Sequence, residues 1–327
     1  MSSIVVIAHR GASGERPEHT LESYRVAIEE GADYIEPDLV MTRDAVLIAR
    51  HENEISGTTD IAQHPEFAAR RRTQIIDGES FTGWFTEDFT LSEIKMLRAR
   101  ERLSDLRPQN RQFDGRFDVP TFDEIMQLIM SANRRPGRNR PIGVYPETKH
   151  PAHFAAIGLP QELSLLDTLR RYQYAKPGAP VFIQSFDPNN LQQLCRMTQL
   201  PLVQLLEHEL GDLAAIAQYA DAIGIAKALA TPEAVLAAHA VELRVHVWTF
   251  RAENEFLPPD LKAGADPATH GNLEAEIRRY LERGIDGFFV DFPALGVRAR
   301  DVYISAVQPV HQPAADTSLP GNKLQGR

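Results

Sequence analysis

Short apolar runs alternate with amphipathic segments along most of this chain. Eight of these runs have the length and composition of buried strands, and the segments between them carry apolar residues at helical spacing. The predicted strands are 4–8, 34–40, 142–146, 181–184, 201–205, 222–225, 245–248 and 287–290, with a short extended run at 46–49 after the second. The predicted helices include 20–30, ended by Gly31, and 163–172, 188–197, 232–240 and 273–283.

Strands that alternate with helices predict a parallel sheet, and eight such units predict its closure into a (β/α)8 TIM barrel. We therefore expect an α/β fold with a single domain at 1–306 and a mobile tail at 307–327, where no apolar period remains. The second strand is followed by an unusually long stretch, so we expect an insertion at about 54–119 over the mouth of the barrel. Helical spacing predicts one helix inside it, at 91–100, and another at 122–132 in the barrel wall.

Composition limits the partners and the compartment. The formal net charge of −10 argues against a nucleic-acid partner, which would need clustered Lys and Arg. No apolar stretch approaches the roughly 20 residues of a membrane span, so we expect no membrane insertion. Cys195 is the only cysteine, which excludes an intrachain disulfide. The chain enters its first strand without a leader, so we expect a cytoplasmic protein, or a periplasmic or secreted one if a leader has been removed.

Ionisable side chains gather where three predicted strands end. They are His9 and Arg10 after the first strand, Glu36 and Asp38 in the second, and Glu147 and Lys149 after the third. Active sites of such barrels lie at the carboxyl ends of the strands. Side chains two residues apart on a strand point to the same face, so Glu36 and Asp38 point together and Glu147 joins them. Three converging carboxylates favour a hard divalent cation, Ca²⁺ first and Mg²⁺ as the alternative.

Each of these residues also has an ordinary structural interpretation. Glu36 and Asp38 could form salt bridges or cap a helix, and His9 alone could be a buried core histidine. Lys149 could simply pair with Glu147. Unrelated structural roles do not gather preferentially at adjacent strand ends of one barrel face, so the joint pattern favours a site for an oxyanion and a metal.

The residues at these strand ends resemble one known family. The stretch 9–52, HRGASGERPEHTLESYRVAIEEGADYIEPDLVMTRDAVLIARHE, is similar to the opening signature of glycerophosphodiester phosphodiesterases. Later strand ends resemble the same family, namely IGVYPETKHP (142–151), VFIQSFDP (181–188), VHVWTFR (245–251) and GIDGFFVDFP (284–293). The resemblance, to the bacterial periplasmic-type branch, implies a TIM-barrel enzyme that hydrolyses deacylated lipids such as glycerophosphocholine and glycerophosphoethanolamine to sn-glycerol 3-phosphate and an alcohol.

The resemblance also implies a metal-dependent hydrolysis with two histidines. It places the metal on Glu36, Asp38 and Glu147, the acid–base pair on His9 and His51, and phosphate binding on Arg10 with Lys149 beside it. One imidazole would take a proton from the nucleophile while the other protonates the leaving alkoxide. The sequence leaves open which histidine is the acid, and whether water or the glycerol hydroxyl attacks. His51 is followed by Glu52 where the family has Asp, which changes the neighbour of the histidine.

Other residues are weaker candidates for substrate contact. Gln184 resembles a family position that could bond the substrate, although it could also be a buried amide. Phe186, Trp248 and Phe288 could form an apolar wall or pack in the core. His19 stands at a helix start and is interpreted as structural.

Two other functions share these features. A phospholipase D of the spider-toxin type, or a phosphatidylinositol-specific phospholipase C, would expose apolar loops at the mouth, whereas 54–119 is rich in Arg, Asp and Glu. A noncatalytic binding protein could keep the phosphate and metal sites, but intact His9 and His51 argue against it. The basic run 70–72 is interpreted as an exposed, solvated face rather than a patch that steers anions, and no stripe indicates an oligomeric state.

Overall fold

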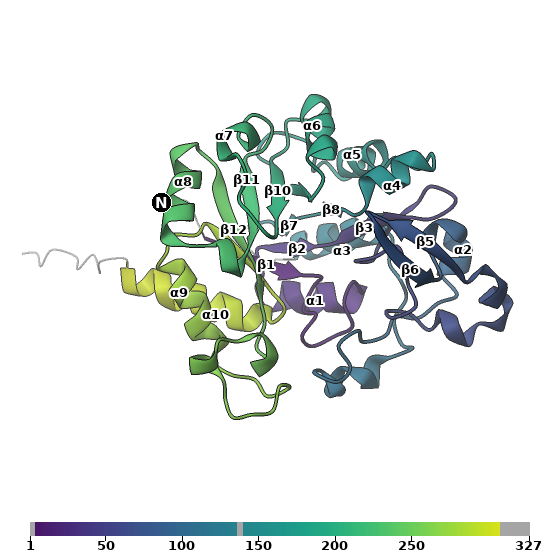
Figure 1. Ribbon diagram of the computed structural model, residues 1–327, viewed down its shortest axis with the longest axis horizontal. Coiled ribbons are helices and arrows are strands. Elements are labelled where there is room, and N and C mark those ends of the chain that lie inside the picture. Colours follow the sequence, from purple (N-terminus) through teal and green to yellow (C-terminus); the bar gives the residue numbers. More distant parts are fainter. Residues whose placement is uncertain (1–3, 136–139, 308–327) are drawn as a thin grey trace, which may run out of the picture.

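The structure is a TIM-barrel-like α/β fold in which helices surround a curled sheet (Figure 1). It is a computed structural model that describes residues 4–135 and 140–307, so the predicted tail from 308 onward lies outside the described residues. The parallel strands are β1 (Val5–His9), β2 (Tyr34–Glu36), β3 (Asp38–Met41), β7 (Gly143–Val144), β8 (Glu147–Thr148), β9 (Ile183–Ser185), β10 (Leu202–Leu206), β11 (Ala222–Ala226), β12 (Arg244–Phe250) and β13 (Gly287–Val290). The short β4 (Leu47–Ala49) pairs antiparallel with β3.

Two of the predicted strands are each divided at a proline. The prediction at 34–40 becomes β2 and β3 on either side of Pro37, and the prediction at 142–146 becomes β7 and β8 around Pro146. Proline has no N–H to donate, but its carbonyl still accepts, as Pro37 O does from Glu147 N at 3.0 Å. The parallel pairing therefore continues from β1 through β2 and β3 to β7 and β8, then through β9 to β13, which pairs again with β1.

Helices cover the outside of the sheet (Figure 1). They are α1 (Leu21–Glu29), α3 (Phe122–Asn133), α4 (Pro151–Ala156), α5 (Glu162–Arg171), α6 (Pro188–Met197), α7 (Leu213–Ile216), α8 (Pro232–Ala240), α9 (Leu273–Leu281) and α10 (Pro293–Val307), with 3-10 turns η5 (Lys227–Leu229), η6 (Asn254–Phe256) and η7 (Pro259–Leu261). Capping boxes start α1 at Thr20 and α3 at Thr121. The sequence pattern does not predict α10, because its apolar residues form no clear stripe. Among the described helices, none combines the length and apolar composition that crossing a membrane requires.

The predicted helix at 91–100 is wrong beyond its first turn. The observed helix, α2 (Leu91–Ile94), ends early because the chain then pairs with a distant segment. Arg98 N donates to Asp60 Oδ1 at 2.7 Å, and Asp60 N donates to Arg98 O at 3.0 Å. Tertiary hydrogen bonds have therefore overridden the local helical spacing.

Short elements between β4 and α3 form a lobe beside the barrel (Figure 1). They are η1 (Ile61–Gln63), η2 (Pro65–Arg70), the hairpin of β5 (Arg72–Ile76) and β6 (Glu79–Gly83), η3 (Thr86–Asp88), α2 and η4 (Pro108–Phe113). The basic run 70–72 lies here. Arg70 pairs with Glu93 at 2.6 Å and Arg72 with Asp88 at 2.7 Å. The side chains of Arg70 and Arg72 are 33% and 43% exposed, so the run is an exposed face as predicted, and surface ion pairs offset the charge of these two guanidinium groups.

The inside of the barrel is filled by its own cluster of buried side chains. This cluster consists of Ile7, Tyr145, Phe182, Val203, Ala222 and Phe289. Tyr145 Oη and His246 Nδ1 lie 2.7 Å apart within this layer. Side chains alternate along β13, so Phe289 points inward while Phe288 is buried in the core between sheet and helices. Of the two alternatives for Phe288, core packing is therefore the one that the structure shows. The inner cluster forms a packed floor below the carboxyl ends of the strands.

Candidate active site

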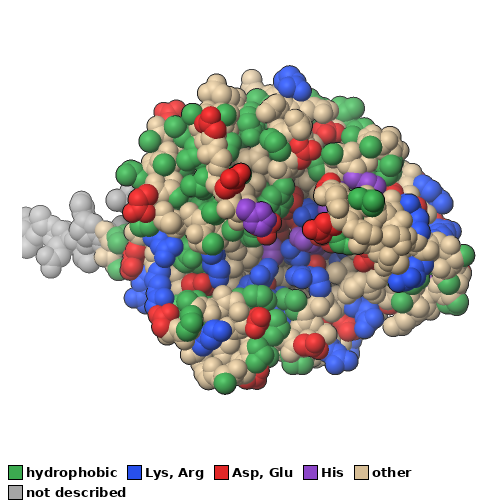
Figure 2. Space-filling view, viewed as in Figure 1, with side chains coloured by type: hydrophobic (Ala, Val, Ile, Leu, Met, Phe, Trp, Pro, Cys, Tyr) green, Lys and Arg blue, Asp and Glu red, His purple; other side chains and the backbone are tan. Residues whose placement is uncertain are grey.

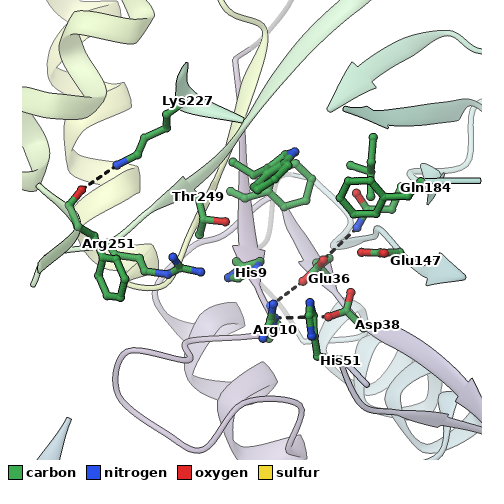
Figure 3. A pocket seen from close by; sticks show the side chains of 15 residues that line it. His9, Arg10, Glu36, Asp38, His51, Glu147, Gln184, Lys227, Thr249 and Arg251 are labelled. Atoms are coloured by element: carbon green, nitrogen blue, oxygen red, sulfur yellow. Dashed lines mark hydrogen bonds and ion pairs between the residues drawn. The ribbon is translucent and has the colours of Figure 1, made fainter. Parts of the chain in front are cut away.

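A cavity of about 290 Å³ lies at the carboxyl ends of the strands, and most of the predicted site residues line it (Figure 3). These are His9, Arg10, Glu36, Asp38, His51, Glu147, Gln184, Phe186 and Trp248. Lys149 lies in an adjoining cavity that shares His51 and Glu147 with the first. Figure 2 shows the hollow in this face of the molecule, with ionisable side chains inside it. The structure therefore brings these candidates together.

Three buried carboxylates in the cavity could hold a metal. Glu36, Asp38 and Glu147 each place an oxygen within 4.8 Å of the others, because Asp38 lies opposite Glu147 in the register of β3 and β8. Burial, and then the charges of Asp38 and Glu147, raise the pKa of Glu36 well above its usual range. Burial, opposed by Lys149, raises the pKa of Glu147 to about 8. Asp38 Oδ1 has no hydrogen-bond partner among the residues that the structure describes, so the group fits a divalent cation.

Neighbouring side chains fix the orientation of these carboxylates. His19 Nε2 lies 2.9 Å from Asp38 Oδ2, and its Nδ1 lies 2.7 Å from Tyr24 Oη. Against the effect of burial, His19 holds the pKa of Asp38 well below its usual range. Gln184 Nε2 donates to Glu36 Oε1 at 2.9 Å. The contacts of His19 with Asp38 and Tyr24 support a structural role for this residue. Contact of Gln184 with substrate stays a prediction.

Arg10 starts a tight turn after β1 that brings its guanidinium group to the carboxylates (Figure 3). Its φ is 60° and that of Gly11 is 85°. A Cβ on Gly11 would lie 2.7 Å from the backbone carbon of Ser23, so the turn requires glycine. Arg10 N donates to Glu36 Oε2 at 2.7 Å, and its Nη1 donates to Glu18 Oε2 at 3.0 Å. The guanidinium is therefore held in place within the cavity.

His9 is oriented by a carboxylate that the sequence analysis does not single out. Its Nδ1 lies 2.6 Å from Asp291 Oδ1. The other oxygen of Asp291 accepts from Arg107 Nη2 at 2.5 Å and from Arg251 Nε at 3.1 Å. Burial, and then the charge of Arg10, lower the pKa of His9 to about 4. The ring is therefore neutral near pH 7, with its proton on Nδ1 toward Asp291 and a lone pair on Nε2.

His51 is held in the same tautomer by its neighbour Glu52. Its Nδ1 lies 2.7 Å from Glu52 Oε1, and its Nε2 lies 3.4 Å from Lys149 Nζ. An ammonium group can only donate, so Nε2 must accept and the ring is neutral. Burial, and then the charges of Arg10 and Lys149, lower the pKa of His51. Both histidines therefore offer an unprotonated Nε2.

Six residues that line the cavity are not among the predicted site residues. They are Leu205, Lys227, Thr249, Arg251, Phe256 and Phe289. Arg251 and Asp291 directly follow β12 and β13, so the rule that finds residues at strand ends would have found both. Arg107 comes from a distant loop and carries no sequence signal. Phe186 and Trp248 meet edge to face with centroids 6.0 Å apart, which gives the cavity an apolar side.

Comparison with known proteins points to a single family. A model of the glycerophosphoryl diester phosphodiesterase family matches residues 9–295. A glycerophosphodiester phosphodiesterase of Arabidopsis thaliana is 36% identical over 325 residues, which cover 88% of this chain and 83% of that protein. A glycerophosphodiester phosphodiesterase of Haemophilus influenzae is 28% identical over 348 residues, with 90% and 89% covered.

Solved structures give the same fold. The crystal structure of a protein from Silicibacter pomeroyi that has been assigned as a glycerophosphoryl diester phosphodiesterase superposes with a TM-score of 0.68 at 23% identity over 92% of this chain and 94% of that one. A phosphodiesterase of Oleispira antarctica, solved in complex with the product sn-glycerol-3-phosphate, has a TM-score of 0.65 at 18% identity over 91% and 96%. At these identities the similarity concerns the fold.

Proposed function

Since the chain belongs to the glycerophosphoryl diester phosphodiesterase family, we propose that it hydrolyses glycerophosphodiesters to sn-glycerol 3-phosphate and an alcohol. Its substrates are deacylated phospholipids such as glycerophosphocholine and glycerophosphoethanolamine. The observation that carries the proposal is that one cavity contains two neutral imidazoles, a guanidinium group and three clustered carboxylates. The catalytic domain is a closed (β/α)8 barrel, and the lobe between β4 and α3 supports an insertion at about 54–119.

Glu36, Asp38 and Glu147 would hold one divalent cation. Both Ca²⁺ and Mg²⁺ bind carboxylate oxygens, and Ca²⁺ is the first choice because it takes about six to eight oxygen ligands in a flexible geometry, with Mg²⁺ as the alternative. When bound, the cation would offset the negative charge of the phosphate oxygens. Arg10 supplies a second positive charge to the same oxygens, and Lys149 supplies a third from the His51 side.

The two histidines exchange protons with the reacting oxygens. One Nε2 takes the proton of the nucleophile as its oxygen bonds to phosphorus, and the bond from phosphorus to the oxygen of the alcohol breaks. The other imidazole, which the bound phosphodiester anion helps to protonate, gives its proton to that oxygen. The nucleophile is either water or the glycerol hydroxyl beside the phosphate, and the second choice would give a cyclic phosphate before hydrolysis.

The test is release of sn-glycerol 3-phosphate from a panel of glycerophosphodiesters. We expect activity to disappear in chelator and to return with Ca²⁺ or Mg²⁺. A ³¹P NMR time course would show a cyclic phosphate if the glycerol hydroxyl attacks. No release from any glycerophosphodiester with either ion would overturn the proposed function.

A further inference from the structure

We propose that His150 is a positioning residue that, as an imidazolium, holds Glu52 in place and through it fixes the orientation of His51. The inference rests on the proposed function, because His51 needs a fixed orientation only if it transfers a proton in that reaction. The relay consists of His51, Glu52, His150 and Asp77, and its last member belongs to the lobe beside the barrel.

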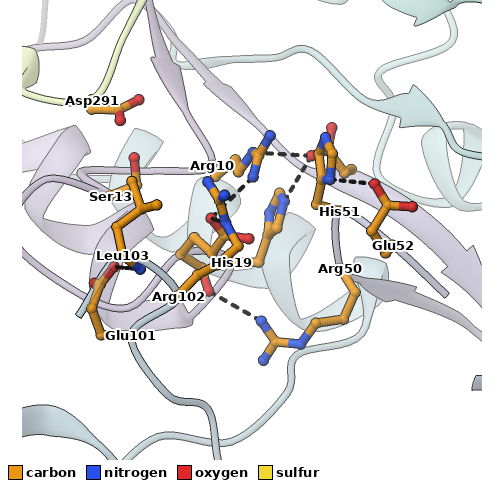
Figure 4. A network of polar contacts seen from close by, with 12 residues as sticks. Arg10, Ser13, His19, Arg50, His51, Glu52, Glu101, Arg102, Leu103 and Asp291 are labelled. Atoms are coloured by element: carbon orange, nitrogen blue, oxygen red, sulfur yellow. Dashed lines mark hydrogen bonds and ion pairs between the residues drawn. The ribbon is translucent and has the colours of Figure 1, made fainter. Parts of the chain in front are cut away.

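The four side chains form a continuous chain of short contacts. Glu52 Oε1 lies 2.7 Å from His51 Nδ1, and Glu52 Oε2 lies 2.8 Å from His150 Nε2. His150 Nδ1 lies 2.6 Å from Asp77 Oδ2. Figure 4 shows the first of these contacts, with Glu52 turned toward the ring of His51. One carboxylate therefore bridges two imidazoles with its two oxygens.

The partners assign different charges to the two rings. Both nitrogens of His150 face carboxylate oxygens, which only accept when ionised, so both nitrogens must carry protons. His51 instead has Lys149 at its Nε2, which requires a lone pair there. The groups that face His150 are Glu52, Asp77 and the nearby charge of Lys149. Burial lowers the pKa of His150, but the two carboxylates outweigh burial and raise this pKa overall. The result is an imidazolium and a neutral imidazole on one carboxylate.

Local backbone geometry brings the relay together. His150 has φ 48° and ψ 44° between β8 and Pro151, the first residue of α4. Asp77 and Gly78 both have positive φ and form the tip of the β5–β6 hairpin. The tip of this hairpin thus reaches the loop after β8. The relay also offers an explanation for glutamate at position 52, where the family has Asp, because this side chain contacts both imidazole rings.

The relay should affect the rate more than substrate binding. Glu52 is 37% exposed, so alone it could rotate into water, and His51 would then lose the partner of its Nδ1 proton. The imidazolium of His150, which is only 11% exposed, prevents this rotation. Misorientation of His51 lowers kcat, whereas KM changes little because the other three members, Glu52, His150 and Asp77, do not line the phosphate-binding cavity.

The kinetic test compares His150→Gln with a matched control. We expect kcat for glycerophosphocholine to fall about ten- to hundredfold, with KM within about twofold. This is the size of the loss seen when a residue that orients a metal-binding side chain is replaced. His153→Gln is the control, because His153 lies one turn further on α4 and bonds Glu87 instead of Glu52. Asp77→Asn, at an exposed turn, should lower kcat in the same direction without a folding defect. Unchanged kcat in both His150→Gln and Asp77→Asn would overturn the positioning role.

The second readout does not depend on activity. In ¹⁵N-histidine-labelled protein at pH 7, we expect protons on both nitrogens of one ring, with a signal that is absent from His150→Gln. A single protonated nitrogen on His150 would overturn the imidazolium assignment. If the wild-type protein hydrolyses no glycerophosphodiester but shows the doubly protonated ring, the proposed function fails while the charge assignment stands.

Discussion

His9 and His51 offer the same ring nitrogen to one cavity, but their surroundings differ. The side chain of Asp291, which orients His9, is 3% exposed and lies between two guanidinium groups. The side chain of Glu52, which orients His51, is 37% exposed and lies between two imidazoles. The comparison teaches that a tautomer can be fixed either by a buried ion network or by a half-exposed one.

The two sides should differ in what it costs to disturb them. Asp291 is buried, yet Arg107 and Arg251 hold its pKa well below the usual range, so it stays charged. A buried charge that loses its partner costs about 3–5 kcal/mol, whereas an exposed pair contributes about 0–1 kcal/mol. We therefore expect changes around His9 to lower both activity and stability, and changes around His51 to lower activity with little loss of stability.

The largest expected effect comes from removing either histidine, and it tests whether His9 and His51 are equally important for catalysis. We expect His9→Ala and His51→Ala each to lower kcat by about two to four powers of ten, because each removes a general acid or base. Release of sn-glycerol 3-phosphate measures this. His208→Ala, whose side chain is 87% exposed, is the control. A rate close to wild type in either variant would reject the acid–base pair.

The second prediction compares how much stability is lost when the buried network around Asp291 or the half-exposed network around Glu52 is disturbed. Arg107→Ala leaves Asp291 and Glu253 without this guanidinium and should lower the free energy of unfolding by about 3–5 kcal/mol. Glu52→Ala should lower it by only about 0–1 kcal/mol. Urea denaturation of both variants gives the values. Equal losses in the two variants would contradict the division into a buried and an exposed network.

The pH dependence of stability should have opposite signs for His9 and His150, whereas His51, whose pKa is also lowered by burial, acts in the same direction as His9. The pKa of His9 is lowered to about 4, so below about pH 6.5 the unfolded chain takes up this proton first. Stability then falls with falling pH by about 1.4 kcal/mol per unit until about pH 4. Despite burial, Glu52 and Asp77 raise the pKa of His150, so its contribution is complete below about pH 6.5 and is lost as pH rises through the raised value.

Two variants separate these contributions. His9→Gln should flatten the acid side of a plot of unfolding free energy against pH, measured in chelator, and His150→Gln should flatten the side above about pH 6.5. Unchanged curves for both variants would show that these histidines do not titrate differently in the folded and unfolded chains.

The smallest effect concerns the apolar side of the cavity. Lys149 Nζ lies 5.7 Å from the centroid of Phe186, whose side chain helps to line the cavity near His51. Such a cation–π contact is worth about 0.5–1 kcal/mol at exposed sites. Because this energy holds Lys149 in its proposed phosphate-binding position, Phe186→Ala should weaken substrate binding by up to this amount and raise KM about two- to fivefold. Steady-state kinetics would detect this, and an unchanged KM would mean that the ring does not help to bind substrate.

The sequence predicts most of the barrel and of the cavity because both depend on short-range rules. Side-chain alternation and the position of strand ends bring Glu36, Asp38 and Glu147 together without any knowledge of distant contacts. The same alternation places Phe288 in the core and Phe289 at the cavity, since a shift of one residue along β13 exchanges these two environments.

Contacts between distant segments could not be predicted in this way. Arg107 reaches Asp291 across 184 positions in the chain, and His150 reaches Asp77 across 73. The helix predicted at 91–100 fails for the same reason, since Asp60 takes up backbone groups that the helix needs. Long-range hydrogen bonds leave no periodic trace in the sequence, so only the folded chain shows them.

The packed floor of the barrel has a consequence for turnover. Among the described residues, Tyr145, Phe182 and Phe289 pack together in the space below the cavity, so we expect no exit through the barrel on that side. Substrate and both products then share the mouth seen in Figure 2. A product that leaves slowly blocks the entry of the next substrate, so accumulated sn-glycerol 3-phosphate should act as a competitive inhibitor and slow the enzyme when it is not removed.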